Sequence, residues 1–239
     1  MKSVQKNKKM TDSSTKEHEE DLRSSSCSFV SFVDRNLFLR GFVDLMENHI
    51  NNYRHKLSNA LGLSAMEEVP VLGAALLGAW KAGHHIYLCG NGGSAGNALH
   101  LANDFIYGAG VRNGAGLRVE ALSANPAVIT CLANDVDYER IYAEQIRVKG
   151  RPGDVLIALS GSGNSPNIVR AIESGNALDM TTFAILGFTG GRCKEIARHS
   201  IHFPVDDMQI AEDLQLIVGH ICMQWLREQE VHGGKCEAC

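Results

Sequence analysis

The chain has 239 residues, of which 44% are hydrophobic and 21% charged, with a formal net charge of −4. This composition excludes the disordered and collagen-like classes, and the mildly acidic balance lacks the basic footprint of a nucleic-acid-binding protein. Seven cysteines, an odd number spread through apolar stretches, indicate reduced core thiols. No apolar run in the sequence reaches the roughly 20 residues that span a bilayer. We therefore expect a globular, cytoplasmic protein that binds neither nucleic acid nor membrane.

The first 35 residues differ in composition from the rest of the chain. Four lysines are followed by a serine- and acid-rich stretch, without the apolar segment of a secretory signal. This pattern predicts a disordered tail over residues 1–35. Beyond it we expect a single domain over residues 36–230 and a frayed tail over residues 231–239.

The hydrophobic pattern predicts helices at both ends of this domain and a parallel sheet between them. Apolar residues recur at helical spacing over residues 38–57, again near residues 67–81, and at the end near residues 211–227. Between them, short apolar runs alternate with helical segments; the runs are 85–89, 117–122, 155–159, 182–186 and 200–203. Strands that alternate with helices predict βαβ units, with ligands bound at the carboxyl ends of the strands.

Two glycine- and serine-rich turns follow the first and the third of these strands. The first reads Gly-Asn-Gly-Gly-Ser over residues 90–94, and the second reads Ser-Gly-Ser-Gly-Asn-Ser over residues 160–165. Glycines let the backbone approach a ligand, and hydroxyl and amide groups converge at the start of the next helix, which suits an anion such as phosphate. One such turn could simply connect a strand to a helix. Two in one sheet favour a phosphate site.

Several motifs together resemble the sugar isomerase (SIS) family over roughly residues 38–228. They are the two turns, Ala-Leu-His-Leu-Ala at 98–102, Ala-Asn-Asp at 133–135 and the strand that leads into Ser160. Within that family the chain is most similar to the phosphoheptose isomerases, which interconvert sedoheptulose 7-phosphate and a glycero-manno-heptose 7-phosphate. The contexts of His100 and His220 carry this narrower resemblance. It implies an α/β fold, a flavodoxin-like five-stranded parallel sheet flanked by helices with an N-terminal helical arm, and a tetramer with active sites between subunits.

The resemblance also implies roles for individual residues. The substrate and phosphate ligands that it implies are Asn91, Gly92, Gly93, Ser94, Asn134, Asp135, Ser160, Gly161, Ser162, Ser165 and Glu212. Asp104 and His220 match residues assigned to proton transfer. The implied metal ligands are His100, Asp104, Glu212 and His220. Two imidazoles and two carboxylates would suit one divalent ion, and we expect zinc. We expect no organic cofactor.

Two of these positions depart from the family pattern. Asp104 replaces a glutamate, which withdraws the carboxylate by one methylene, and Glu212 replaces a glutamine, which adds a negative charge. Glu212 and His220 are also eight residues apart, about 12 Å of axial rise in a straight helix. They can share one ion if their side chains lean together, if the helix is irregular at its start, or if separate subunits contribute. The sequence leaves these alternatives open.

The expected reaction is an aldose–ketose interconversion, in which a proton moves between neighbouring carbons through an enediol. A second hypothesis is a non-catalytic SIS regulator that acts by protein–protein contact, like the relative that binds a replication initiator. A third is an isomerase of another phosphosugar, with Asp104 and Glu212 as the adaptation. The regulator lacks the histidine that matches His220, so the presence of His220 with His100 favours the enzyme.

Overall fold

The computed structural model describes residues 32–110 and 114–229, and the chain separates into two compact units, Met1–Asn52 and Tyr53–Cys239. The predicted tails over residues 1–35 and 231–239 lie outside the described residues, except that residues 32–35 already belong to a helix. Within the described ranges no single helix is long and apolar enough to cross a membrane, although the bent pair Leu39–Leu61 and Ser64–Ala82 meets that test by length and composition.

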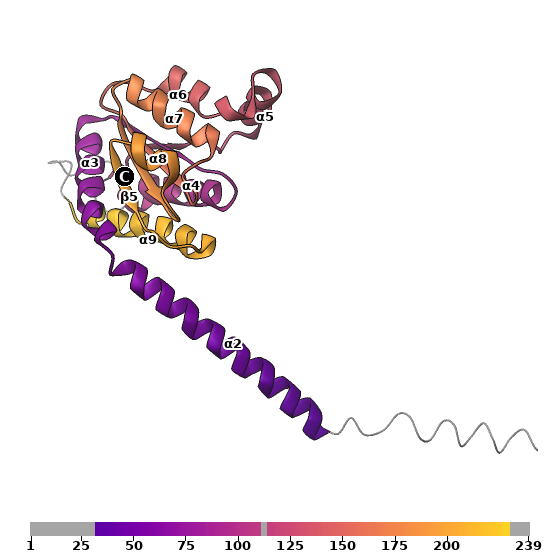
Figure 1. Ribbon diagram of the computed structural model, residues 1–239. Helices are drawn as coiled ribbons and strands as arrows, with labels where there is room; N and C mark the ends of the chain where they lie inside the picture. The colour runs from indigo at the N-terminus through magenta and orange to yellow at the C-terminus, as the bar shows by residue number, and fades with distance from the viewer. Residues whose placement is uncertain (1–31, 111–113, 230–239) are drawn as a thin grey trace, which may run out of the picture. The chain divides into compact units, whose positions relative to one another are not determined.

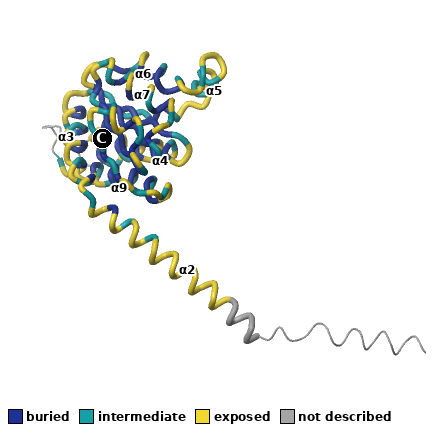
Figure 2. The backbone as a smooth tube through the Cα atoms, in the orientation of Figure 1, coloured by how far each residue is buried: buried dark blue, intermediate teal, exposed yellow. Residues whose placement is uncertain are grey.

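Helix α2 (Phe32–Leu61) contributes its first two-thirds to the first unit and is longer than the pattern over residues 38–57 predicted. Most described residues of α2 are exposed, as its yellow trace in Figure 2 shows, and they include several large apolar residues. These side chains are Leu39, Phe42, Val43, Leu45, Met46 and Ile50. So many exposed apolar groups on one helix are typical of a surface that packs against a partner.

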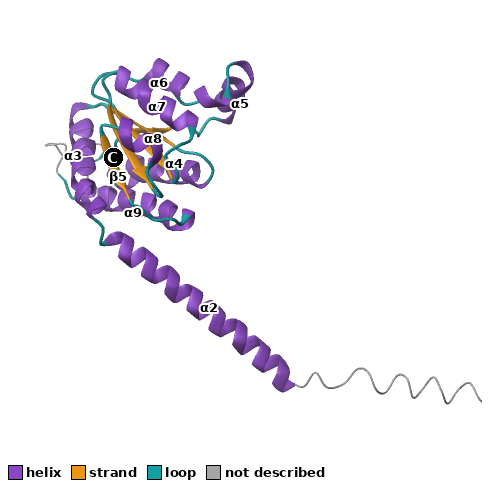
Figure 3. Cartoon of the chain, in the orientation of Figure 1, coloured by secondary structure: helices purple, strands orange, loops and turns teal. Residues whose placement is uncertain are grey.

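The second unit is built on a five-stranded, all-parallel sheet with the order β2-β1-β3-β4-β5. Figure 3 shows the strands in orange among the helices. The strands are β1 (His85–Cys89), β2 (Arg118–Ala121), β3 (Val155–Ser160), β4 (Thr181–Leu186) and β5 (His199–His202). All five match predicted apolar runs, because short β-branched and apolar runs bounded by turn residues form buried strands. The order confirms the predicted flavodoxin-like fold.

Helices cover both faces of this sheet (Figure 1). One face carries α3 (Val69–Ala82), α4 (Gly93–Asn103) and α9 (Met208–Arg227). The other carries α6 (Ala143–Lys149), α7 (Pro166–Ala177) and α8 (Gly191–Ile196). Side chains of β3 alternate between the two cores: Ile157 packs with α3 and α9, whereas Leu156 packs with α7. This alternation has the period of two that a strand requires.

Shorter elements connect these helices and strands. They are η1 (Ser64–Glu68), η2 (Asp104–Gly108), α5 (Pro126–Asp135) and η4 (Tyr138–Arg140). Element η2 is a π-turn, in which the N–H of Ala109 donates to the carbonyl of Asp104 at 3.1 Å, five residues earlier. Such turns are rare and concentrate at functional sites.

Candidate active site

A cleft of about 290 Å³ opens at the carboxyl ends of β1 and β3. The order of the strands reverses between β1 and β3, because β2 is added on one side of β1 and β3 on the other. Ligands bind at such points in open parallel sheets. The cleft is lined by Asn91, Gly92, Gly93, Ser94, Leu159, Ser160, Gly161, Ser162, Ser165, Met208 and Glu212. It therefore gathers every predicted substrate-binding residue except Asn134 and Asp135.

The serine turn after β3 is closed by its own side chains. The Ser160 hydroxyl accepts a hydrogen bond from the N–H of Gly163 at 3.0 Å, and the Ser162 hydroxyl accepts from the N–H of Asn164 at 3.3 Å. Gly163 has φ +67°, and a side chain there would collide with the carbonyl of Gly190. Ser165 then precedes α7 as its N-cap residue. The turn thus presents hydroxyls beside the positive end of a 12-residue helix, which favours an anion.

The glycine turn after β1 brings a carboxylate against the start of α4. Gly92 has φ +54°, and a Cβ at Gly93 would overlap the Glu212 carboxylate, which comes from α9. Glycine at position 93 is therefore what allows Glu212 to lie at the N-terminal end of α4, where negative charge is favourable. Glu212 faces the cleft from this position.

A second cluster, His100, Asp104 and His220, forms where α4 and η2 meet α9. His100 Nε2 lies 2.9 Å from His220 Nε2, and Asp104 Oδ2 lies 3.5 Å from His100 Nε2 and 3.4 Å from His220 Nε2. The two histidine side chains are 51% and 38% exposed, so the cluster is open to solvent in one chain. We call these three residues the His–Asp–His cluster.

Close contact between α4 and α9 creates this cluster. A side chain at Gly219 would collide with Leu101, and these two residues directly neighbour His220 and His100 in the chain. A buried polar network fixes the register beside it: Gln215, 1% exposed, donates to the Ser94 hydroxyl at 3.1 Å and accepts from Asn97 at 3.0 Å. Small residues and satisfied buried amides together hold two helices at one separation and one register.

The donor set of the cluster fits a divalent metal ion. Bonds of about 2.0 Å in a tetrahedral zinc site place neighbouring ligand atoms about 3.3 Å apart. The three distances here, 2.9, 3.4 and 3.5 Å, fall close to that value, and all three ligand atoms lie within 4.8 Å of one another. Three protein ligands leave one position for water or substrate, as in catalytic zinc sites. Without an ion, the two imidazoles can instead share one N–H···N hydrogen bond.

Glu212 does not join this cluster, although the sequence resemblance grouped it with these three residues. Helix α9 is continuous from Met208 to Arg227, so the eight residues between Glu212 and His220 correspond to about 12 Å along its axis. Glu212 occupies the cleft and His220 the contact with α4. The structure therefore separates the predicted set of four into a cluster of three and one cleft carboxylate.

Comparison with known proteins decides the family. The model of the SIS domain matches residues 51–187, more than half of the chain. The chain belongs to the SIS-domain family. Among curated proteins it is similar to the phosphoheptose isomerase of Akkermansia muciniphila, with 39% identity over 154 residues, which cover 64% of this chain and 80% of that protein. It is 33% identical to the phosphoheptose isomerase of Clostridium acetobutylicum over 172 residues, 72% of this chain and 87% of that one.

Solved structures confirm the SIS fold. The phosphoheptose isomerase of Neisseria gonorrhoeae superposes with a TM-score of 0.71 at 24% identity, over 77% of this chain and 98% of that one. A phosphoheptose isomerase from Francisella tularensis gives the same TM-score at 20% identity, over 78% and 98% of the two chains. The similarity therefore extends over nearly the whole length of those structures.

Asn134 and Asp135 lie outside the cleft of this SIS domain. They end α5, whose ten residues are all described and all exposed or half-buried. Asn134 donates to Asp135 at 2.7 Å, and Asp135 accepts from the Cys131 thiol at 3.4 Å, which raises the pKa of that thiol. Within one chain, then, these two residues bind each other rather than line the cleft.

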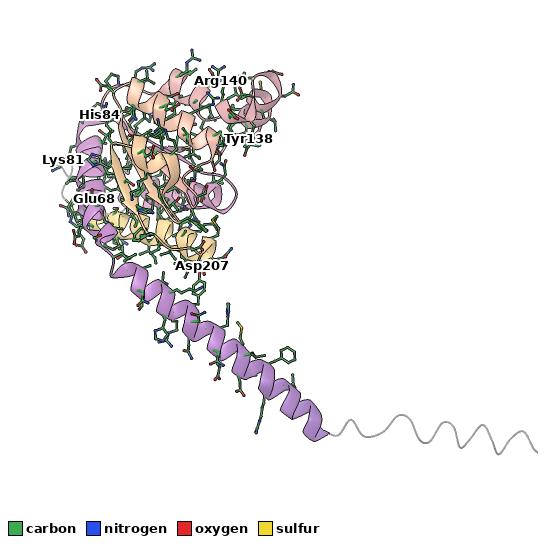
Figure 4. The ribbon with its side chains drawn as sticks, in the orientation of Figure 1. Glu68, Lys81, His84, Tyr138, Arg140 and Asp207 are labelled. Atoms are coloured by element: carbon green, nitrogen blue, oxygen red, sulfur yellow. The ribbon has the colours of Figure 1, made fainter. Side chains whose placement is uncertain are left out.

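Sequence reasoning missed three residues that hold the glycine turn of the cleft from behind: Tyr138, Tyr142 and Asn167. Asn167, at the start of α7, bonds the side chain of Asn91, and the Tyr138 hydroxyl, labelled in Figure 4, donates to Asn91 at 3.3 Å. The Tyr142 hydroxyl donates to the carbonyl of Gly90, and burial raises the pKa of Tyr142. These partners are 47 to 76 positions away from the turn in sequence, so no local pattern marks them.

Proposed function

We propose that this SIS-domain protein is a phosphoheptose isomerase, which interconverts sedoheptulose 7-phosphate and a glycero-manno-heptose 7-phosphate in heptose biosynthesis. The observation that carries the proposal is the cleft at the carboxyl ends of β1 and β3, lined by nearly all the predicted substrate ligands. The curated relatives named phosphoheptose isomerase, at 33% to 39% identity, supply the substrate class.

The serine turn is the proposed phosphate anchor. The hydroxyls of Ser162 and Ser165 and the N-terminal end of α7 offer donors and positive potential to a phosphate in the cleft. A charged group held at one end of the sugar lets remote binding energy place the reacting carbons. Met208 and Leu159 provide the apolar part of the wall.

Asp104 and His220 are the proposed proton-transfer groups. Isomerisation removes a proton from the carbon next to the carbonyl and returns one to its neighbour, work that an imidazole or a carboxylate can perform. His100, Asp104 and His220 are also the residues that would hold a divalent ion, zinc by our proposal. Such an ion would supply Lewis-acid polarisation of the substrate oxygens. Glu212 would then face the sugar hydroxyls as an acceptor.

We further propose that the protein works as a cytoplasmic homotetramer, with the active site completed between subunits. Two observations support this arrangement. The His–Asp–His cluster is absent from the lining of the cleft in the described part of one chain, and so are Asn134 and Asp135. The exposed apolar side chains of α2 offer a surface for assembly.

The proposal is tested by incubating zinc-loaded protein with a panel of ketose phosphates and following aldose formation by NMR. We expect turnover of sedoheptulose 7-phosphate above that of pentulose and hexulose phosphates. Turnover of another member of the panel alone would reassign the substrate. Absence of turnover throughout, with the protein folded and zinc-loaded, would refute the enzyme function.

A further inference from the structure

A buried asparagine at the start of α7, Asn167, bonds to the glycine turn that lines the cleft. It is the second residue of α7 and is 2% exposed. Its side-chain amide pairs with that of Asn91, which belongs to the turn after β1. Asn91 Nδ2 donates to Asn167 Oδ1 at 2.8 Å, and Asn167 Nδ2 donates back to Asn91 Oδ1 at 2.8 Å. A reciprocal amide pair thus connects the glycine turn to the start of α7, directly after the serine turn.

This pair uses most of the hydrogen-bonding capacity of Asn91. Its Oδ1 accepts from Asn167 and from the Tyr138 hydroxyl at 3.3 Å, which occupies both lone pairs. Its Nδ2 carries two protons and gives one to Asn167. In a reciprocal amide pair each amide uses the N–H on the side of its own oxygen, so the other N–H of Asn91 is directed away from Asn167. Towards a ligand in the cleft, Asn91 is left with the role of an N–H donor.

The orientation of the Asn91 side chain depends on its pair with Asn167, because the neighbouring backbone gives it little support. Asn91 stands between Gly90 and Gly92, and Gly92 has φ +54°. Its flanking residues therefore offer no side chains to hold it. A buried amide such as that of Asn167 costs free energy unless it is paired. Asn167 is paired by Asn91, the side chain of the glycine turn that carries an amide and lines the cleft.

We propose that Asn167 is a positioning residue, which fixes Asn91 as an N–H donor to an oxygen of the sugar in the cleft. The inference rests on the proposed function, because it requires a ligand rich in acceptor oxygens. The phosphate belongs to the serine turn, so the oxygen that Asn91 contacts is a carbonyl or hydroxyl oxygen of the sugar chain. Asn167 itself does not line the cleft and acts through Asn91.

A double-mutant cycle tests this relation. Asn91→Ala and Asn167→Ala should each lower kcat/KM on the heptose phosphate by about tenfold or more, the effect of one hydrogen bond to substrate. Because Asn167 acts through Asn91, Asn167→Ala should change kcat/KM by less than about twofold when Asn91 is already alanine. The control is Asn176→Ala, at the other end of α7, where the amide donates to the Ile196 carbonyl and accepts from Thr182, each at 2.7 Å. It should lower Tm and leave kcat/KM within about twofold.

Asn167→Asp separates orientation from packing. This change keeps the size of the side chain and an acceptor for the Asn91 N–H, but it removes the donor and sets a negative oxygen against Asn91 Oδ1. It should therefore lower kcat/KM as Asn167→Ala does.

Three results would overturn the inference. The first is a double variant in which the two losses of kcat/KM simply add. The second is an unchanged kcat/KM in both Asn167→Ala and Asn167→Asp. The third is unfolding of both Asn167 variants, which would make the amide pair a requirement of the fold. A wild-type protein without isomerase activity would refute the proposed function instead, so the two failures are distinguishable.

Discussion

At the scale of single residues, the proposed function requires hydroxyls from one turn and imidazoles from two helices. Ser162 and Ser165 come from one turn, and their proximity follows from sequence spacing. His100 and His220 are 120 positions apart and meet through the packing of α4 on α9. The first arrangement could be derived from the sequence itself, whereas the second required either a family resemblance or the structure.

The first residue-level prediction concerns the phosphate anchor. Replacing both Ser162 and Ser165 by alanine removes two hydrogen bonds to a charged group, each contributing roughly 1.5–3 kcal/mol. Sugar-phosphate affinity should fall by about two to four orders of magnitude. Calorimetric titration measures it, and Tm should change little because both hydroxyls face the cleft. Unchanged affinity would remove the serine turn from the phosphate site.

The second residue-level prediction concerns the proposed metal site. His220→Ala should abolish stoichiometric zinc binding and turnover together, whereas Glu212→Gln should leave zinc bound, because Glu212 lies in the cleft rather than in the His–Asp–His cluster. Atomic absorption of dialysed protein gives the zinc content. Loss of zinc in Glu212→Gln equal to that in His220→Ala would restore Glu212 to the ligand set. Retention of zinc by His220→Ala would remove the cluster from metal binding.

At the scale of elements, the contact between α4 and α9 determines whether the cluster exists. Gly219→Ala would force the new methyl group into Leu101, at a cost of about 1–3 kcal/mol of stability, and would move His220 away from His100. The matched control is Gly78→Ala on α3, where the space is open and alanine should stabilise the helix by about 0.5–1 kcal/mol. Chemical denaturation and zinc affinity measure both effects. Equal behaviour of the two variants would show that close packing at Gly219 is unimportant.

The start of α9 contains a pH-sensitive contact with the C-terminal part of α2. The Tyr53 hydroxyl donates to Asp213 at 2.6 Å, and burial, followed by this bond, raises the pKa of Tyr53 to about 12 from its usual 10. A raised pKa in the folded state means that the stabilisation is complete below pH 10 and disappears as pH rises towards 12. Tyr53→Phe should be less stable than wild type at pH 8, and the difference should shrink over that range. Urea denaturation at each pH measures it.

At acid pH, the start of α9 has a second pH-dependent contact, and this one is lost as pH falls. Asp207, labelled in Figure 4, caps α9 by accepting from the N–H of Ile210. It also pairs with Lys56 at 2.8 Å, and this bond is the main cause of the lowered pKa of Asp207. A lowered pKa stabilises the folded state above the usual carboxyl pKa, and that stabilisation is lost as pH falls through the folded value.

Elements were predictable where a local period or turn specified them. The five strands and the helices after the two turns followed from apolar runs and glycine spacing, because these depend on near neighbours in sequence. The π-turn at Asp104 and the amide pair of Asn91 with Asn167 could not be derived in this way. Both depend on contacts between segments that are distant in the chain. The sequence spacing of Glu212 and His220 already predicted a separation of about two helical turns. Only the structure shows that α9 is continuous between them.

At the scale of the whole molecule, the exposed apolar side chains of α2 predict assembly. Leu39 is 58% exposed and Met46 58% exposed, values that a monomer rarely tolerates in one patch. Light scattering at micromolar concentration should give a tetramer. Leu39→Glu combined with Met46→Glu should shift it towards smaller species, whereas Asn51→Glu, a polar exposed position on the same helix, should not. A monodisperse wild-type monomer would contradict the tetramer.

The central claim is that the cleft and the His–Asp–His cluster together isomerise a heptose phosphate by proton transfer. Its most direct test is NMR of zinc-loaded protein incubated with sedoheptulose 7-phosphate in D2O, with His220→Ala beside it. We expect an aldose phosphate that carries solvent deuterium at carbon 2, and no product with His220→Ala. Full turnover by His220→Ala, or no aldose phosphate from the wild-type protein, would contradict it.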